Sequence, residues 1–114
     1  MSAPKAAQRR DRIRDLNDAF RSTFSSGQIL LTPGINDLPS DVRAKATRMV
    51  ATFADFDSDN DPQGEHDFGA FDLAGHKVFW KIDYYNLTLD GGTEDPSDPA
   101  ITRRVLTLML AEEY

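Results

Sequence analysis

The chain has 114 residues, with 19 acidic and 13 basic side chains, two histidines and no cysteine, so its formal charge is −6. This length supports one hydrophobic core, and we expect a single domain over residues 1–114, with residues 1–8 as a disordered tail. The absence of cysteine excludes disulfides, thiolate metal clusters and a cysteine nucleophile. No apolar run is long enough for a membrane span or an export signal, which predicts a cytoplasmic protein without a membrane partner.

The N-terminal half of the chain predicts two amphipathic helices separated by a short strand. In the first helix, at about residues 6–24, apolar residues recur at helical spacing: Ile13, Leu16, Phe20 and Phe24. Residues 28–32 read as a buried strand that Pro33 and Gly34 stop. The second helix is expected to begin near Ser40, after Pro39, and to end near residue 54.

The middle of the chain predicts an antiparallel hairpin. Residues 68–73 and 77–85 are rich in aromatic and β-branched residues and flank the turn Ala74-Gly75-His76. Alternation along the second arm separates two sets of side chains. The set expected in the core is Val78, Trp80, Ile82 and Tyr84, and the set expected on a partly solvated face is Phe79, Lys81, Asp83 and Tyr85.

Residues 87–98 read as a loop, and Asp98 followed by Pro99 has the pattern of a helix start. We therefore predict a last helix over residues 99–112, whose wide apolar surface would be buried on two sides or at an interface. The predicted fold is a small two-layer α+β domain with a three-stranded antiparallel sheet, in the order α-β-α-β-β-α. One core is expected to bury Val42, Met49, Val50, Phe53, Trp80, Ile82, Val105 and Met109.

Charge is distributed unevenly along the chain. Residues 1–50 carry a net charge of +4, and residues 51–100 carry −10. The densest acidic stretch has no lysine or arginine within it and comprises Asp55, Asp57, Asp59, Asp61, Glu65 and Asp67. Such a stretch is either a well-solvated loop or a surface for a cationic partner.

The triplet Glu65-His66-Asp67 is the candidate for acid–base chemistry, with Asp83 as a further candidate catalytic residue. The alternative is that the triplet fixes its loop by hydrogen bonds. Residues 57–61 resemble the start of a calcium-binding EF-hand loop, but Pro62 occupies the required glycine position, so at most a looser divalent-cation contact remains. An extended arm between His66 and His76 would separate them by about 30 Å, and we expect no shared metal and no cofactor.

Five stretches together have a family resemblance: RIRDLNDAFR, ILLTPGI, DNDPQGEHDFGAFDL, VFWKIDYY and DPSDPAITRRVLTLMLAEEY. In this order and spacing the chain resembles the bacterial domain-of-unknown-function family 3768. The resemblance covers about residues 10–114 and implies no activity, cofactor or catalytic residue. It implies similarity to small proteins of bacterial chromosomes and mobile elements. Plasmid, phage or defence-related roles are therefore to be considered.

Three functional hypotheses follow. The first is a non-enzymatic binding module that engages a protein with a basic surface, for example as an anti-defence or nucleic-acid-mimicking inhibitor, and that binds free nucleic acid poorly. The residues expected to bind that partner are Asp55, Asp57, Asp59, Asp61, Glu65, Phe79 and Tyr85. The second is a small enzyme with an acid–base or divalent-metal site at the triplet, and the third is nucleic-acid binding through the two basic helices.

Overall fold

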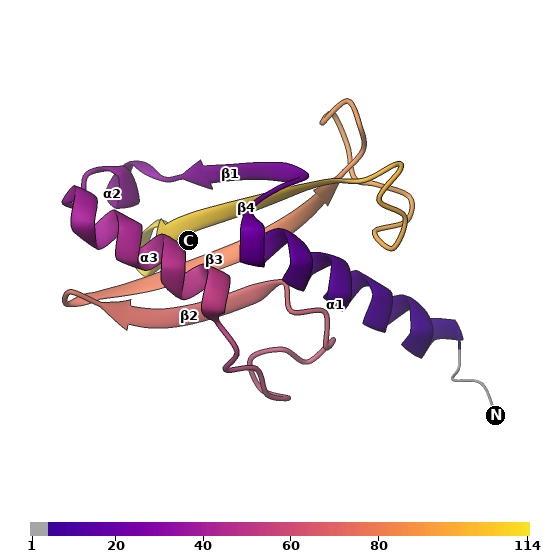
Figure 1. Ribbon diagram of the computed structural model, residues 1–114, viewed down its shortest axis with the longest axis horizontal. Helices are drawn as coiled ribbons and strands as arrows, with labels where there is room; N and C mark the ends of the chain where they lie inside the picture. The colour runs from indigo at the N-terminus through magenta and orange to yellow at the C-terminus, as the bar shows by residue number, and fades with distance from the viewer. Residues whose placement is uncertain (1–4) are drawn as a thin grey trace.

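The computed structural model describes residues 5–114 and contains one four-stranded mixed sheet. The strands lie in the order β1-β4-β3-β2, with bounds Gly27–Leu31 (β1), Phe68–Leu73 (β2), His76–Tyr85 (β3) and Arg103–Leu110 (β4). Strand β1 pairs in parallel with β4, whereas β3 is antiparallel to both β4 and β2 (Figure 1). The sheet therefore has two edges, β1 and β2.

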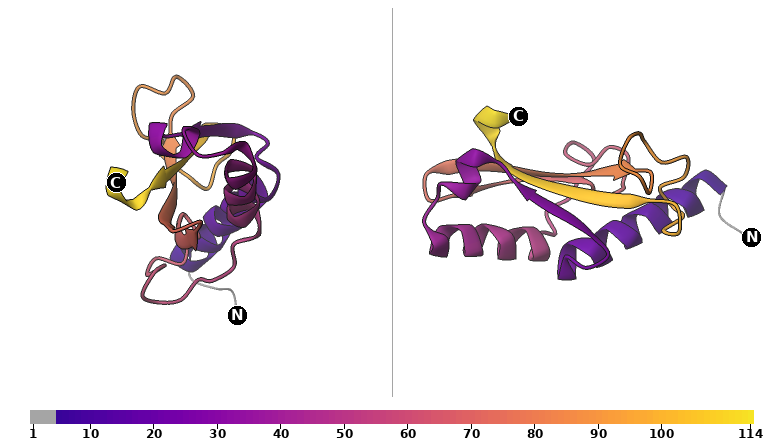
Figure 2. Two further views of the ribbon diagram at one scale, coloured as in Figure 1. Left: turned by 90° about the vertical axis from the view of Figure 1, so that its left-hand side faces the viewer. Right: turned by 90° about the horizontal axis from the view of Figure 1, so that it is seen from above.

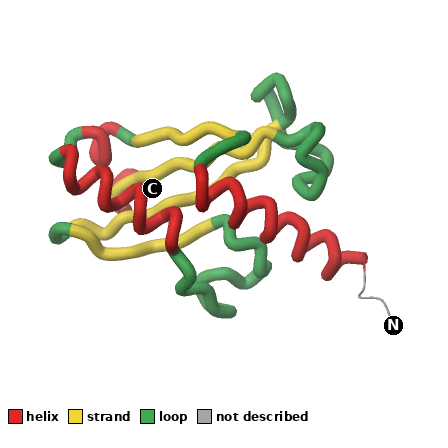
Figure 3. Tube along the Cα trace, viewed as in Figure 1, coloured by secondary structure: helices red, strands yellow, loops and turns green. Residues whose placement is uncertain are grey.

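The long helices cover one face of this sheet. Helices α1 (Lys5–Thr23) and α3 (Ser40–Thr52) lie on the same side, as Figures 2 and 3 show. The short helix α2 (Pro33–Asn36) links β1 to α3, and a 3-10 turn, η1 (Ala111–Glu113), follows β4. We call the face opposite α1 and α3 the open face of the sheet.

Most of the predicted elements are confirmed with small shifts at their ends. The α+β class, the first two amphipathic helices, the first strand and the hairpin are all present. The expected burial of the first strand is wrong, because it lies at an edge of the sheet and contains no buried residue. Residues 1–4 of the expected tail lie outside the described residues, and residues 5–8 belong to α1. Within residues 5–114, no helix has the length and apolar character needed to cross a membrane.

The predicted helix over residues 99–112 is wrong, because this segment forms β4. Strand β4 lies between β1 and β3 and is buried on both faces, so apolar residues occupy consecutive positions and the period of two is hidden. Val105 and Met109 lie on the open face, whereas Leu106 and Leu108 lie on the helix side. The sheet therefore has four strands with one parallel pair, instead of three antiparallel strands.

The main core lies between the helices and the sheet. Trp80 and Val50 are fully buried there, and Ile82 is 4% exposed. Three predicted core residues pack against this cluster while remaining partly exposed: Val42, Met49 and Phe53. Val105 and Met109 are buried as predicted, but on the open face and thus outside the helix-side core.

Candidate functional site

The acidic segment, residues 55–67, connects α3 to β2 and lies beside the β2 edge of the sheet (Figure 1). Its first half forms a turn around Asp57, whose Oδ1 accepts the backbone N–H groups of Asp59 and Asn60 at 2.9 Å each. The Oδ1 of Asn60 in turn accepts the N–H of Asp57 at 2.8 Å. Asp55, Asp57 and Asp59 are exposed, so this turn presents carboxylates to solvent.

His66 fastens the second half of the acidic segment to α1. Its Nδ1 lies 3.0 Å from both carboxylate oxygens of Asp18, and its ring stacks on Phe56 with a centroid distance of 3.8 Å. The backbone N–H of His66 donates to the Oδ1 of Asp61 at 3.3 Å. The Asp61 side chain is only 6% exposed, so its carboxylate is largely used inside the protein.

Tyr84 is the centre of a polar network on the helix side of the sheet. Its hydroxyl accepts a hydrogen bond from the Nδ2 of Asn17 at 2.7 Å and lies 3.1 Å from Glu65 Oε1 and 3.3 Å from Asp67 Oδ2. The Oδ1 of Asn17 accepts the Nε–H of Arg104 at 2.6 Å. One hydroxyl proton is therefore available to two carboxyl groups.

This network changes the proton affinities of its members. Burial raises the pKa of the Asp67 carboxyl, and the neighbouring Glu65 charge raises it further. Burial also raises the pKa of the Tyr84 phenol, with a second contribution from the charge of Asp67. The phenol therefore stays protonated and acts as a hydrogen-bond donor.

The structure divides the candidate catalytic triplet. Glu65 and Asp67 both face Tyr84, whereas His66 faces Asp18 and Asp61 on a different side of the acidic segment. Within the described residues, no group of three histidine or carboxylate side chains could hold a metal ion. His66 and His76 lie at opposite ends of β2.

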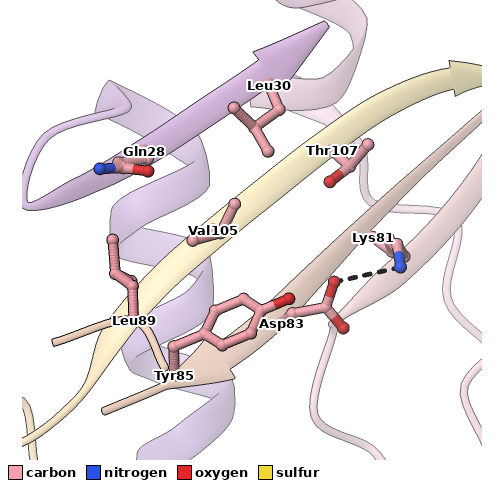
Figure 4. A pocket seen from close by; sticks show the side chains of 8 residues that line it. All are labelled: Gln28, Leu30, Lys81, Asp83, Tyr85, Leu89, Val105 and Thr107. Atoms are coloured by element: carbon pink, nitrogen blue, oxygen red, sulfur yellow. Dashed lines mark ion pairs between the residues drawn. The ribbon is translucent and has the colours of Figure 1, made fainter. Parts of the chain in front are cut away.

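The open face carries the other predicted residues. A hollow of about 300 Å³ lies near the β1 edge and is lined by Gln28, Leu30, Lys81, Asp83, Tyr85, Leu89, Val105 and Thr107 (Figure 4). Asp83 forms an ion pair of 3.1 Å with Lys81 here, on the opposite side of the sheet from Tyr84. Tyr85 contributes its ring to the hollow (Figure 4).

Phe79 belongs to an aromatic cluster on the same face. Its ring centroid lies 5.3 Å from that of Phe68 and 5.7 Å from that of Tyr114. The sequence reasoning did not single out Leu30, Leu89 or Val105 for this face. Leu30 was expected in a buried strand. Val105 was expected in a helix, and a helical pattern does not indicate which face of a sheet its side chain occupies.

The arginines of the first helix are largely engaged within the chain. Arg9 pairs with Asp95 at 3.1 Å, and the Nε–H of Arg12 donates to the carbonyl of Ser97 at 2.7 Å. Arg14 pairs with Asp11 and Asp15, at 3.3 and 3.1 Å. These contacts engage three arginines of α1 with neighbouring carboxylates and one backbone carbonyl.

The fold and the site thus define a small α+β protein with an acidic segment at one sheet edge and an open sheet face. The family model described as "Protein of unknown function (DUF3768)" matches residues 31–113. The chain belongs to this family, which confirms the resemblance drawn from its motifs. No curated protein and no solved structure matches the chain.

Proposed function

We propose that the protein is a non-enzymatic binding module that engages a protein partner with a basic surface. The observation that carries this proposal is the open face, which combines a hollow, a Lys81–Asp83 ion pair and large apolar side chains. Leu30 and Leu89 in the hollow are 51% and 42% exposed. Apolar side chains that converge on a hollow are typical of a site that receives an anchoring side chain of a partner.

The acidic segment supplies long-range attraction to such a partner. Of the carboxylates predicted to bind it, Asp55, Asp57 and Asp59 are exposed. Asp61 and Glu65 make contacts inside the protein, so we assign them to the structure of the segment. The attraction is strongest at low salt and falls as the Debye length shortens to about 8 Å near physiological ionic strength.

Apolar anchors are needed as well, because an exposed ion pair contributes only about 0 to 1 kcal/mol. Tyr85 in the hollow and Phe79 in the aromatic cluster are the anchors we propose. The net charge of −6 repels free nucleic acid. A suitable partner is therefore a protein whose basic surface otherwise binds nucleic acid. The carboxylates of the acidic segment would contact that surface in place of nucleic-acid phosphates.

The anchor is tested by affinity capture from a lysate of the source organism, with quantitative mass spectrometry of the bound proteins. Three baits are compared: wild type, Tyr85→Ser and Leu87→Ser. Leu87 is 50% exposed and does not line the hollow, so it is the matched control. We expect a basic protein that binds wild type and the control but not Tyr85→Ser. Identical capture by all three baits contradicts the proposal.

The charge contribution is tested on the purified captured protein, by measuring Kd across a salt series. The test variant replaces Asp55, Asp57 and Asp59 with Asn, which keeps the turn because an amide oxygen at position 57 still accepts both N–H groups. The control makes the same change in net charge at exposed sites elsewhere, by Asp15→Asn, Asp37→Asn and Glu112→Gln. We expect only the test variant to bind more weakly and with a smaller salt dependence. Equal effects of the two variants would show that net charge alone matters.

A further inference from the structure

Strand β1 has backbone hydrogen-bonding groups on its outer side that pair with no other strand within residues 5–114. The N–H of Thr32 donates to the carbonyl of Leu108 at 3.1 Å, toward β4. Successive residues of a strand direct their backbone groups to alternate sides, so Gly27, Ile29 and Leu31 direct theirs away from β4. Because β1 is the first strand in the sheet order, these groups lie along a free edge.

This edge lacks charge, proline and a bulge, three of the features that protect sheet edges. Residues 27–31 (GQILL) contain no charge and no proline, and the pairing of β1 with β4 runs without a bulge. Leu30 and Leu31 are 51% and 40% exposed, on opposite faces of the strand. The other edge differs, because β2 carries the exposed Asp72 and lies beside the acidic segment. An uncharged, apolar edge is suited to pairing with another strand.

The distribution of charge favours a second copy of this chain as the occupant. Each chain carries −6, so two copies repel each other, and this repulsion is smallest where they meet far from their acidic segments. The acidic segment leads into β2, which is at the opposite end of the strand order from β1. Contact through β1 therefore places the two acidic segments at the outer ends of the assembly. A basic partner, in contrast, gains no electrostatic attraction from GQILL.

We propose that two copies associate by antiparallel pairing of their β1 strands about a two-fold axis at Ile29. In this register Ile29 faces its counterpart, and Gly27 of each copy faces Leu31 of the other. All three positions direct their N–H and C=O groups outward, so each facing pair can exchange two hydrogen bonds. Leu31 then lies beside a residue without a side chain, and Leu30 lies beside Gln28 of the other copy. Both exposed leucines then lie along the joint between the two copies.

Antiparallel pairing also fixes the relative orientation of the two open faces. Residues that face each other across an antiparallel pair point to the same side of the sheet. Gln28 and Leu30 line the hollow, so the hollows of the two copies lie on one continuous face, on either side of the joint. Such a dimer presents two equivalent hollows, which favours a partner with two-fold symmetry or a repeated surface.

The association is tested by sedimentation equilibrium of the full chain over a range of concentrations. We expect wild type to sediment with twice the chain mass, and Leu30→Lys/Leu31→Lys to sediment as a monomer. The matched control is Leu87→Lys/Ile101→Lys, at residues that are 50% and 38% exposed and lie outside β1. The control should dimerise as wild type does. A monomeric wild type, or equal behaviour of the two double variants, overturns the proposal.

A second variant tests the backbone directly. Leu31→Pro removes an outward N–H while leaving the bond from Thr32 to β4 in place. We expect it to be folded by circular dichroism and monomeric.

In wild type, the amides of Ile29 and Leu31 should exchange hydrogen more slowly as concentration rises. Added salt should strengthen the association by screening like charges, opposite to its effect on partner binding. Concentration-dependent protection at β2 instead of β1 overturns the proposal.

Discussion

The side-chain amide of Asn17 donates to the hydroxyl of Tyr84 at 2.7 Å and so joins α1 to the sheet. Asn17 is fully buried, and its Nδ2 also donates to the backbone carbonyl of Glu65 at 3.0 Å. The same amide accepts from Arg104 on β4. A single asparagine thus connects the first helix, the acidic segment and two strands. Loss of any partner leaves a buried polar group unsatisfied.

Tyr84→Phe is expected to destabilise the fold by about 1 to 3 kcal/mol, because Glu65, Asp67 and Asn17 lose their shared hydroxyl. The measurement is urea unfolding followed by tryptophan fluorescence. Tyr85→Phe is the control, because it removes a hydroxyl from the next residue on the open face. If both variants unfold at the same urea concentration as wild type, the network contributes no stability.

The free energy of unfolding of Asp67→Asn should increase relative to that of wild type as pH rises. Burial, reinforced by Glu65, raises the pKa of Asp67 in the folded protein above the 3.8 of an ordinary aspartate. The folded state therefore binds this proton more tightly than the unfolded state does. The stability linked to it is fully present below pH 3.8 and is lost as pH rises through the folded pKa. Asparagine does not titrate and avoids this loss.

The measurement for Asp67→Asn is the free energy of unfolding of wild type and variant across acidic to neutral pH. The difference between them should shift in favour of the variant as pH increases. Asp72→Asn, at an exposed carboxylate in β2, is the control for a general charge effect. A difference that is constant with pH argues against a raised pKa of Asp67 in the folded state.

The elements predicted well from the sequence are those whose pattern is local. Trp80 and Ile82 alternate with polar residues, which identified their strand and its buried face. The segment of β4 has no such alternation, because its side chains are buried on both faces of the central strand. Its identity as a strand depends on pairing with β1 and β3, which no window of residues 99–112 reveals.

The candidate site was predictable only in part, for the same reason. Residue type was enough to single out Glu65 and Asp67. Their common partner Tyr84 was assigned to the core without its hydroxyl contacts. Asn17 lies 67 residues from Tyr84 and 87 residues from Arg104 along the chain, so the sequence carries no local signal of the network.

Gly69→Ala should destabilise the fold by about 1 to 3 kcal/mol, because a Cβ there would lie 2.6 Å from Cε2 of the fully buried Trp80 ring. The ring is rigid and cannot move away without disturbing the core. A smaller ring should relieve the collision, so Gly69→Ala should cost less in a Trp80→Phe background. Denaturant unfolding of wild type, the two single variants and the double variant gives the coupling energy between positions 69 and 80. Additive effects would show that the collision is relieved elsewhere.

Arg21 links α1 to the end of α3, and its replacement should loosen that end selectively. Its Nη1 donates to the carbonyls of Val50 and Phe53 at 2.7 Å each, and its Nη2 donates to Asp18 at 2.9 Å. The residue is 4% exposed, and its guanidinium carbon lies 5.1 Å from the Trp80 ring centroid. Lysine cannot reproduce this planar fork, so we expect Arg21→Lys to cost about 1.5 to 3 kcal/mol.

The part of the fold that Arg21→Lys destabilises shows whether Arg21 mainly links the two helices or mainly packs in the core. Hydrogen exchange of Arg21→Lys should be faster in the last turn of α3, whose terminal carbonyls lose their donor, while the β2–β3 hairpin keeps its protection under native conditions. Arg14→Lys is the control, since Arg14 is a partly exposed arginine of the same helix that pairs with Asp11 and Asp15. Its exchange pattern should match wild type. Uniformly faster exchange throughout Arg21→Lys would instead indicate that Arg21 stabilises the whole domain through its contact with Trp80.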